Sequence, residues 1–195
     1  MKALASFIIL LALFPTTKRR LIDSDKSITP LKLAKSNIDK LRDDKILVIE
    51  VLVKEVNKDG LTRVVDENWP EHVETTYNIW RDQHGKILLV GEYLYSESGD
   101  WFIGYEHYID SKGKVFAFVR NTNFFNSECT DGVAYEKVTE FYTEGFKLIS
   151  KSYSLTDDKD QKLNKENCIN NYDFPHSISK SVEEFLEKTN YKSIR

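Results

Sequence analysis

One short motif occurs twice in the sequence, and it is the motif of a tight β-hairpin. The copies occupy residues 80–88 and 108–116, and each places an Asp two residues after an aromatic side chain. Three residues after Asp82 and after Asp110 comes a Gly, which a Lys follows. The Asp can bond the backbone of its own turn, and the Gly can adopt the positive φ that a type I turn with a bulge requires. The motifs therefore predict antiparallel strands on either side of each turn.

Segments of period-two hydrophobicity continue along the chain beyond these motifs. They predict strands at about 73–81, 86–95, 101–109, 114–121, 133–143 and 146–155. Successive segments begin about a dozen residues apart, so no helix fits between them and parallel crossover units cannot form. The sequence thus predicts a twisted antiparallel β-meander of about six strands.

The middle of this meander is apolar on both of its faces. In residues 101–109, one face carries Trp101, Ile103, Tyr105, His107 and Ile109, and the other carries Phe102, Gly104 and Tyr108. A sheet with one wet face would instead alternate apolar and polar residues. We therefore expect a helix, the curl of the sheet or a partner to cover the second face.

Before the meander, the pattern predicts a helix whose end is ambiguous. Thr29 can cap a helix and Pro30 suits its first turn. Residues 46–53 are rich in β-branched side chains and fit either a continued helix or a strand. We favour one helix over about residues 30–56, because residues 54–56 continue its apolar face; the alternative is a helix that ends near residue 44, followed by a strand.

At the C-terminal end, a short amphipathic helix is predicted from Ile178 onward. Ser181 and Glu184 fit a capping box, and Val182 and Phe185 continue a narrow apolar stripe. The fold class predicted is α+β, with an N-terminal and a C-terminal helix packed on the meander.

The N-terminal sequence indicates a targeting signal rather than an element of the fold. Residues 3–14 are apolar apart from Ser6, which is the length of a signal-peptide core and too short to span a bilayer comfortably. We expect residues 1–17 to be a signal peptide, with an uncleaved membrane anchor as the alternative. Residues 18–28 then form a flexible arm, and residues 29–195 form a single α+β domain.

The two cysteines, Cys129 and Cys168, extend the prediction of export. An even number of cysteines in an exported chain predicts a disulfide, whereas two reduced thiols are the alternative. The expected location is therefore periplasmic or extracellular.

Composition and motifs exclude several function classes. The net charge of −3 lacks the basic excess that nucleic-acid binding needs. Neither cysteine has a ligand at metal-binding spacing, so we expect no metal, and no phosphate loop or dinucleotide fingerprint predicts a cofactor. Contact with a membrane is expected only through an uncleaved signal anchor.

The candidate binding residues come from an excess of aromatic side chains in the middle of the chain. Phe124 and Phe125 lie in a predicted loop near Cys129, and loops carry many binding residues. The full candidate set for binding an apolar ligand or an unknown protein partner is Phe124, Phe125, Trp101, Tyr105 and His107.

Three functions are consistent with these features. The first is a non-enzymatic binding or interaction module of the cell envelope. The second is a small hydrolase that uses His107 with a nearby carboxylate, which would require His107 to lie in a cleft. The third is a structural envelope protein that associates through an open sheet edge.

Overall fold

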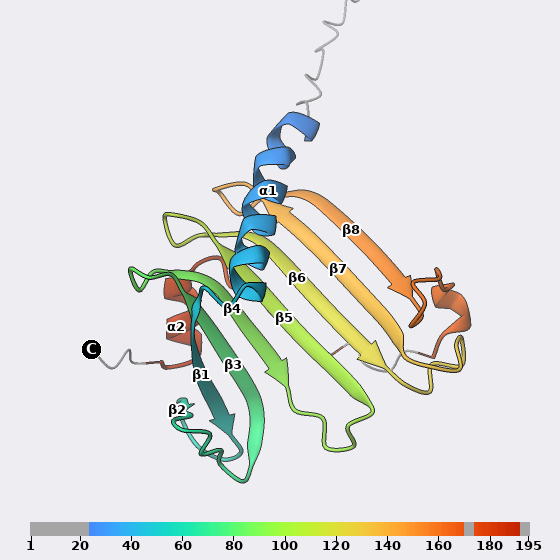
Figure 1. The fold of residues 1–195 in the computed structure, drawn as a ribbon, viewed down its shortest axis with the longest axis horizontal. Coiled ribbons are helices and arrows are strands. Elements are labelled where there is room, and N and C mark those ends of the chain that lie inside the picture. Colours follow the sequence, from blue (N-terminus) through green and yellow to red (C-terminus); the bar gives the residue numbers. More distant parts are fainter. Residues whose placement is uncertain (1–23, 170–173, 192–195) are drawn as a thin grey trace, which may run out of the picture.

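The computed structural model describes residues 24–169 and 174–191, and its centre is one eight-stranded antiparallel sheet (Figure 1). The strand order is β2-β1-β3-β4-β5-β6-β7-β8. The helices are α1 (Ser24–Asp43), the 3-10 helix η1 (Lys165–Asn167) and α2 (Val182–Lys188). The strands are β1 (Val48–Glu55), β2 (Thr62–Arg63), β3 (Val73–Arg81), β4 (Ile87–Leu94), β5 (Trp101–Ile109), β6 (Val115–Phe124), β7 (Ala134–Tyr142) and β8 (Leu148–Thr156).

The α+β class is confirmed, with a helix at each end of the described chain and a meander between them. All six predicted strands are present as β3 to β8, close to their expected bounds. The prediction of about six strands is nevertheless wrong in number, because β1 and β2 add two strands at one edge of the sheet.

The predicted helix over residues 30–56 is also wrong beyond Asp43. Lys45 takes a positive φ of 57°, and the Ile46 N–H donates to the Leu41 carbonyl at 2.9 Å, which ends α1 in the manner of a C-cap. The β-branched run then pairs with β3 as strand β1. Pairing along a neighbouring strand therefore outweighs the continued helical spacing of residues 54–56.

Helix α1 begins earlier than predicted. It starts at Ser24, so residues 24–28 are helical rather than part of the expected flexible arm, and Pro30 lies inside the helix instead of in its first turn. The predicted signal peptide, residues 1–17, lies outside the described residues. None of the helices in the described ranges is long and apolar enough to cross a membrane.

The twin motifs form the turns that their sequence predicts. Asp82 accepts backbone N–H groups of His84 and Lys86 at 2.9 and 3.0 Å, and Asp110 makes the equivalent pair of bonds at 2.7 and 2.9 Å. The glycines take φ values of 79° and 77°. Both hairpins are thus explained by turn geometry alone.

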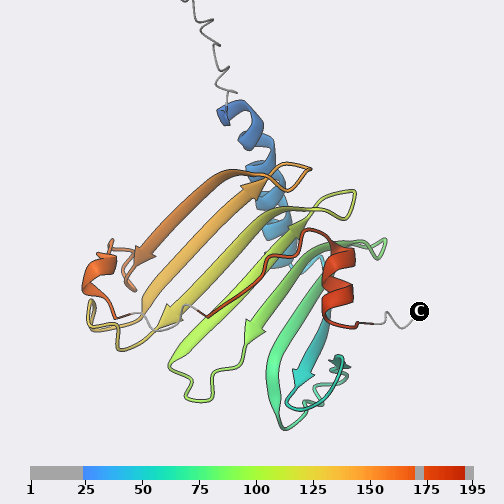
Figure 2. The same ribbon diagram turned by 180° about the vertical axis from the view of Figure 1, so that it is seen from behind.

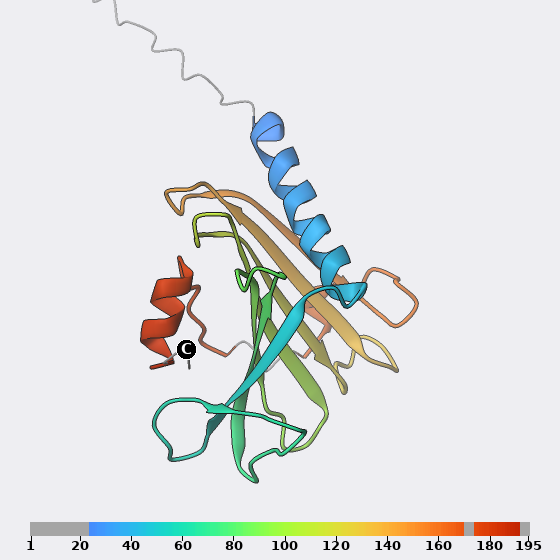
Figure 3. The same cartoon turned by 60° about the vertical axis from the view of Figure 1, so that its left-hand side comes forward.

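One face of the sheet, the α1 face, is covered by α1 over part of its width. The helix contributes Ile28, Leu31, Ala34, Ile38 and Leu41 to this cluster, and the sheet contributes Trp80, Leu89, Tyr108, Ala117, Val119 and Phe141. Figure 3 shows α1 and α2 on opposite sides of the sheet. The opposite face, the α2 face, therefore has a cover of its own.

The α2 face is covered by α2 and by residues 174–181, the C-terminal segment, which crosses the strands in Figure 2. Phe185 of α2 packs with Leu52, Ile79 and Val90. The C-terminal segment adds Ile178 to a cluster with Ile103 and Phe118. The second apolar face expected from the sequence is thus covered by the chain itself.

The predicted disulfide is present between Cys129 and Cys168. It joins the loop before β7 to the chain after η1, and beside it the Ile169 N–H donates to the Ser127 carbonyl at 2.8 Å. The start of the C-terminal region is therefore fixed to the sheet.

Candidate ligand-binding face

Three of the predicted binding residues lie together on the α2 face of β5, beneath the C-terminal segment. Phe174 packs on Trp101 with ring centroids 5.5 Å apart, and His176 stacks on Tyr105 at 4.7 Å. His107 follows on the same strand and face. These aromatic side chains bind the protein's own C-terminal segment, so they form no open groove in the described structure.

His107 lies in the core rather than in a cleft. Its side chain is 3% exposed, its Nε2 accepts the Ser179 N–H at 3.3 Å, and its ring meets Phe118 edge-on at 5.1 Å. Burial lowers the pKa of His107 to about 4, with a smaller contribution from the positive charge of Lys188. An uncharged, sealed imidazole cannot reach a substrate, which removes the observation that the hydrolase hypothesis required.

The two predicted loop phenylalanines separate. Phe124 is the last residue of β6, is 0% exposed and packs with Ala134 and Leu155, so its side chain is part of the core. Phe125 is 48% exposed. Alternation along β6 places one side chain inward and the next outward, so the expectation of a two-residue binding loop is corrected.

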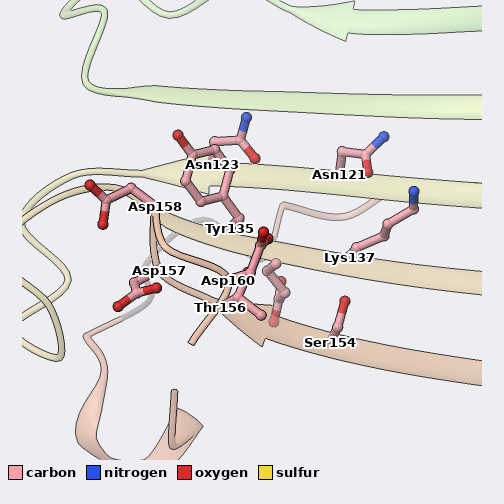
Figure 4. Close-up of a pocket in the computed structure, with 10 residues that line it drawn as sticks. Asn121, Asn123, Tyr135, Lys137, Ser154, Thr156, Asp157, Asp158 and Asp160 are labelled. Carbon is pink, nitrogen blue, oxygen red and sulfur yellow. The ribbon is translucent and has the colours of Figure 1, made fainter. Parts of the chain in front are cut away.

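An open hollow of about 450 Å³ lies on the α1 face of β6, β7 and β8 (Figure 4). Its lining residues are Asn121, Asn123, Tyr135, Glu136, Lys137, Ser154, Thr156, Asp157, Asp158 and Asp160. Three strands and the turn after β8 supply these residues, and the Glu136 side chain points to the α2 face, where it accepts a hydrogen bond from Tyr153. Most of the lining residues have polar or charged side chains, in contrast to the apolar groove that the aromatic excess predicted.

The strand register arranges the lining side chains in rows. Asn121 pairs with Lys137, which pairs with Ser154, and two residues along each strand Asn123 lies beside Tyr135. Because side chains two apart share a face, both rows point to the same side of the sheet as Ala117 and Val119, beyond the part covered by α1. Rigid strands therefore position every member of the two rows.

The polar side chains of these rows are free to meet a ligand. Within the described part of the chain, the side chains of Asn121, Asn123 and Lys137 form no hydrogen bond or ion pair with other protein groups. Tyr135 between them is 39% exposed. The face thus offers two amides, an ammonium group and an aromatic ring without using them for its own stability.

The turn beside the hollow contributes three aspartates to the lining, whereas Lys159 of the same turn lies outside the lining. Asp157 accepts the N–H groups of Lys159 and Gln161 at 2.9 and 2.8 Å, and Asp158 and Asp160 complete an acidic turn. Lys137 is the only cationic side chain in the lining. Among the residues that the structure describes, no group of His, Cys, Asp and Glu is arranged to hold a metal ion.

No candidate residue predicted from the sequence lies in this hollow, although one signal for it exists. Asn121 and Asn123 continue the alternation of Ala117 and Val119 with polar side chains, and Ser150, Ser152 and Ser154 do the same along β8. A face that changes from apolar to amide and hydroxyl along one strand marks where the core ends and an accessible surface begins.

No protein family, curated protein or solved structure that was compared with this chain matches it.

Proposed function

We propose that the protein is an exported, non-enzymatic binding module. Its ligand is held by the hollow on the α1 face of β6, β7 and β8, here named the β6–β8 face, which carries Asn121, Asn123, Tyr135, Lys137 and Ser154. The observation that carries the proposal is the pair of rows around Tyr135, in which polar side chains on rigid strands surround an exposed ring without partners of their own. Sites that bind small molecules combine a hollow with a few fixed polar groups. The stability of the fold does not require these polar side chains to lack partners within the described chain.

The disulfide supports the proposal of export. Such bonds persist in oxidising compartments and are rare in the cytosol. We expect protein isolated from the medium or the envelope to begin after residue 15 in N-terminal sequencing. Mature protein that still begins at Met1 would contradict cleavage and support the anchor instead.

The binding proposal can be tested without knowing the ligand. A ¹⁵N-labelled sample is titrated with a library of small polar compounds, and perturbed amides are mapped onto the sheet. We expect hits to cluster at Asn121, Asn123 and Tyr135 and to disappear in Asn123→Ala. Hits that cluster elsewhere, or that survive Asn123→Ala unchanged, would contradict this site.

A further inference from the structure

We infer that the ligand of the β6–β8 face is a neutral oligosaccharide, an inference that rests on the proposed function and specifies its ligand. A pyranose ring has an apolar C–H side and a rim of hydroxyl groups. It is therefore recognised by an aromatic ring together with planar groups that both donate and accept hydrogen bonds. The face carries both kinds of group in a fixed register.

Two exposed aromatic side chains flank one of the amides. Phe102 on β5 pairs with Asn123 on β6, which pairs with Tyr135 on β7. Phe102 is 40% exposed and is supported by Tyr93, whose ring centroid lies 5.7 Å away. Two strand spacings separate the two rings by roughly 10 Å. This separation suits a chain of several sugar rings rather than one small molecule.

The amides supply the matching polar contacts. Each Asn side chain carries one carbonyl acceptor and two N–H donors, and neighbouring sugar hydroxyls likewise donate and accept. Asn121 and Asn123 lie two residues apart on one strand, and Ser154 adds a hydroxyl in the same row as Asn121. An apolar ligand would leave these groups without partners, which disfavours it.

The charged side chains in the lining restrict the class of ligand further. Asp157, Asp158 and Asp160 outnumber the single cationic side chain in the lining, Lys137. The lining therefore carries more negative than positive side chains, which disfavours phosphates, nucleic acids and acidic glycans relative to uncharged ligands.

The test uses the mature, oxidised protein on an array of hexasaccharides built from glucose, mannose, galactose, xylose and N-acetylglucosamine, with uronic-acid oligomers as the anionic arm. We expect at least one neutral hexasaccharide to bind and to perturb the amides of Asn121, Asn123 and Tyr135. Tyr135→Ala should weaken that binding about tenfold, because it removes the stacking platform. Phe102→Ala should weaken hexasaccharide binding more than disaccharide binding.

The matched control is Tyr153→Ala. Tyr153 is an exposed tyrosine on the adjacent strand β8, but it faces the α2 side, where its hydroxyl donates to Glu136 at 3.0 Å. Its loss should leave the dissociation constant within twofold, and near-ultraviolet circular dichroism checks that each variant is folded. Equal weakening by Tyr135→Ala and Tyr153→Ala would overturn the inference.

The outcomes separate the two levels of the proposal. Binding of other polar compounds at Asn123 without any neutral oligosaccharide, or preference for uronic-acid oligomers, would overturn the sugar inference and leave the binding function standing. Failure of every polar compound to perturb this face would overturn both.

Discussion

Burial of His107 links the stability of this protein to pH. The folded chain holds the pKa of His107 at about 4, whereas an unfolded chain would show an ordinary value of about 6.5. Between these values the unfolded state binds more protons, so stability is present above pH 6.5 and is lost as the pH falls toward 4. We expect His107 alone to cost about 2 kcal/mol of unfolding free energy between pH 7 and pH 5.

Urea unfolding of the wild type and of His107→Gln at both pH values measures this loss. Gln can still accept the Ser179 N–H, but it does not titrate in this range. Acid titration of carboxylates, including Glu92 with its raised pKa, is common to both proteins and cancels in the comparison. Identical pH dependence in the two proteins would show that His107 is charged in the fold or accessible to solvent.

A polar cluster around Glu106 lies beneath α1, and the missing side chains of Gly91 and Gly104 leave room there for Tyr93. The Glu106 carboxylate accepts a hydrogen bond from Arg42 at 3.0 Å. The Tyr108 hydroxyl, which donates to Asp39 at 2.6 Å, lies 3.1 Å from Glu106, and Tyr93 lies at 3.4 Å. Arg42 belongs to α1, so this cluster fixes the helix on the sheet. A methyl group at Gly91 would lie 2.5 Å from the Tyr93 hydroxyl oxygen.

Gly91→Ala should therefore destabilise the fold by about 1–3 kcal/mol, because the Tyr93 ring must leave its place. The same change in a Tyr93→Ala background should cost much less, since the space is then empty. Chemical unfolding of the two single variants and the double variant gives the coupling energy. Additive effects would mean that Gly91 is required for another reason.

At the scale of elements, the sequence predicted the hairpins best where turn chemistry was explicit. The same turn occurs at residues 143–147 and 157–161, where Phe146 and Asp160 take the positive φ in place of Gly. Because neither residue is Gly, the sequence motif identifies only the two hairpins that carry Gly85 and Gly113. For strand β1 the local pattern allows both a continued helix and a strand, and the alternative of a helix ending near residue 44 is the correct one. Pairing with β3, which no local pattern encodes, selects the strand.

The candidate site was harder to predict than the fold. Strand alternation correctly placed Trp101, Tyr105 and His107 on one face, but it could not show that His176, far along the chain, stacks over them. The aromatic excess is consistent with both core packing and binding, and most of these rings fill the cores on the two faces of the sheet. Exposure of Tyr135 follows from the extent of α1 over the sheet, which is a tertiary property.

The disulfide is the element that fixes the start of the C-terminal region. It closes a sequence separation of 39 residues, for which the chain-entropy model gives about 4 kcal/mol, with measured values commonly lower. We expect Cys129→Ser with Cys168→Ser to lower the unfolding free energy by about 2–4 kcal/mol. Urea unfolding of this variant and of reduced wild type should agree, and the intact mass of wild type should rise by two hydrogens on reduction. An unchanged mass would refute the bond.

The whole molecule places a helix over part of one sheet face and its own C-terminal region over the other. Helix α1 and the C-terminal segment seal the two apolar clusters from opposite sides, which leaves the polar end of the α1 face accessible. The sheet is wider than helix α1. The covered part of the α1 face therefore forms a core, and the uncovered part forms the candidate site.

The outer edge of β8 is a further exposed feature of the described fold. The chain after β8 returns to pair at its end, through the Leu163 N–H and the Leu155 carbonyl at 2.9 Å. Between Leu148 and Ser154, no segment in the described ranges pairs with this edge. Open edges invite association between molecules, and lysines on or beside them oppose it; here these are Lys147 and Lys151.

We therefore expect the protein to be a monomer by size-exclusion chromatography with light scattering, and Lys147→Val with Lys151→Val to produce dimers or larger species. Lys159→Val, which removes a lysine from the turn beyond the edge, is the control and should stay monomeric. A wild-type dimer that Leu148→Pro or Ser152→Pro dissociates would contradict this expectation, because proline interrupts pairing at a strand edge. It would support instead the hypothesis of a structural protein that assembles through its sheet.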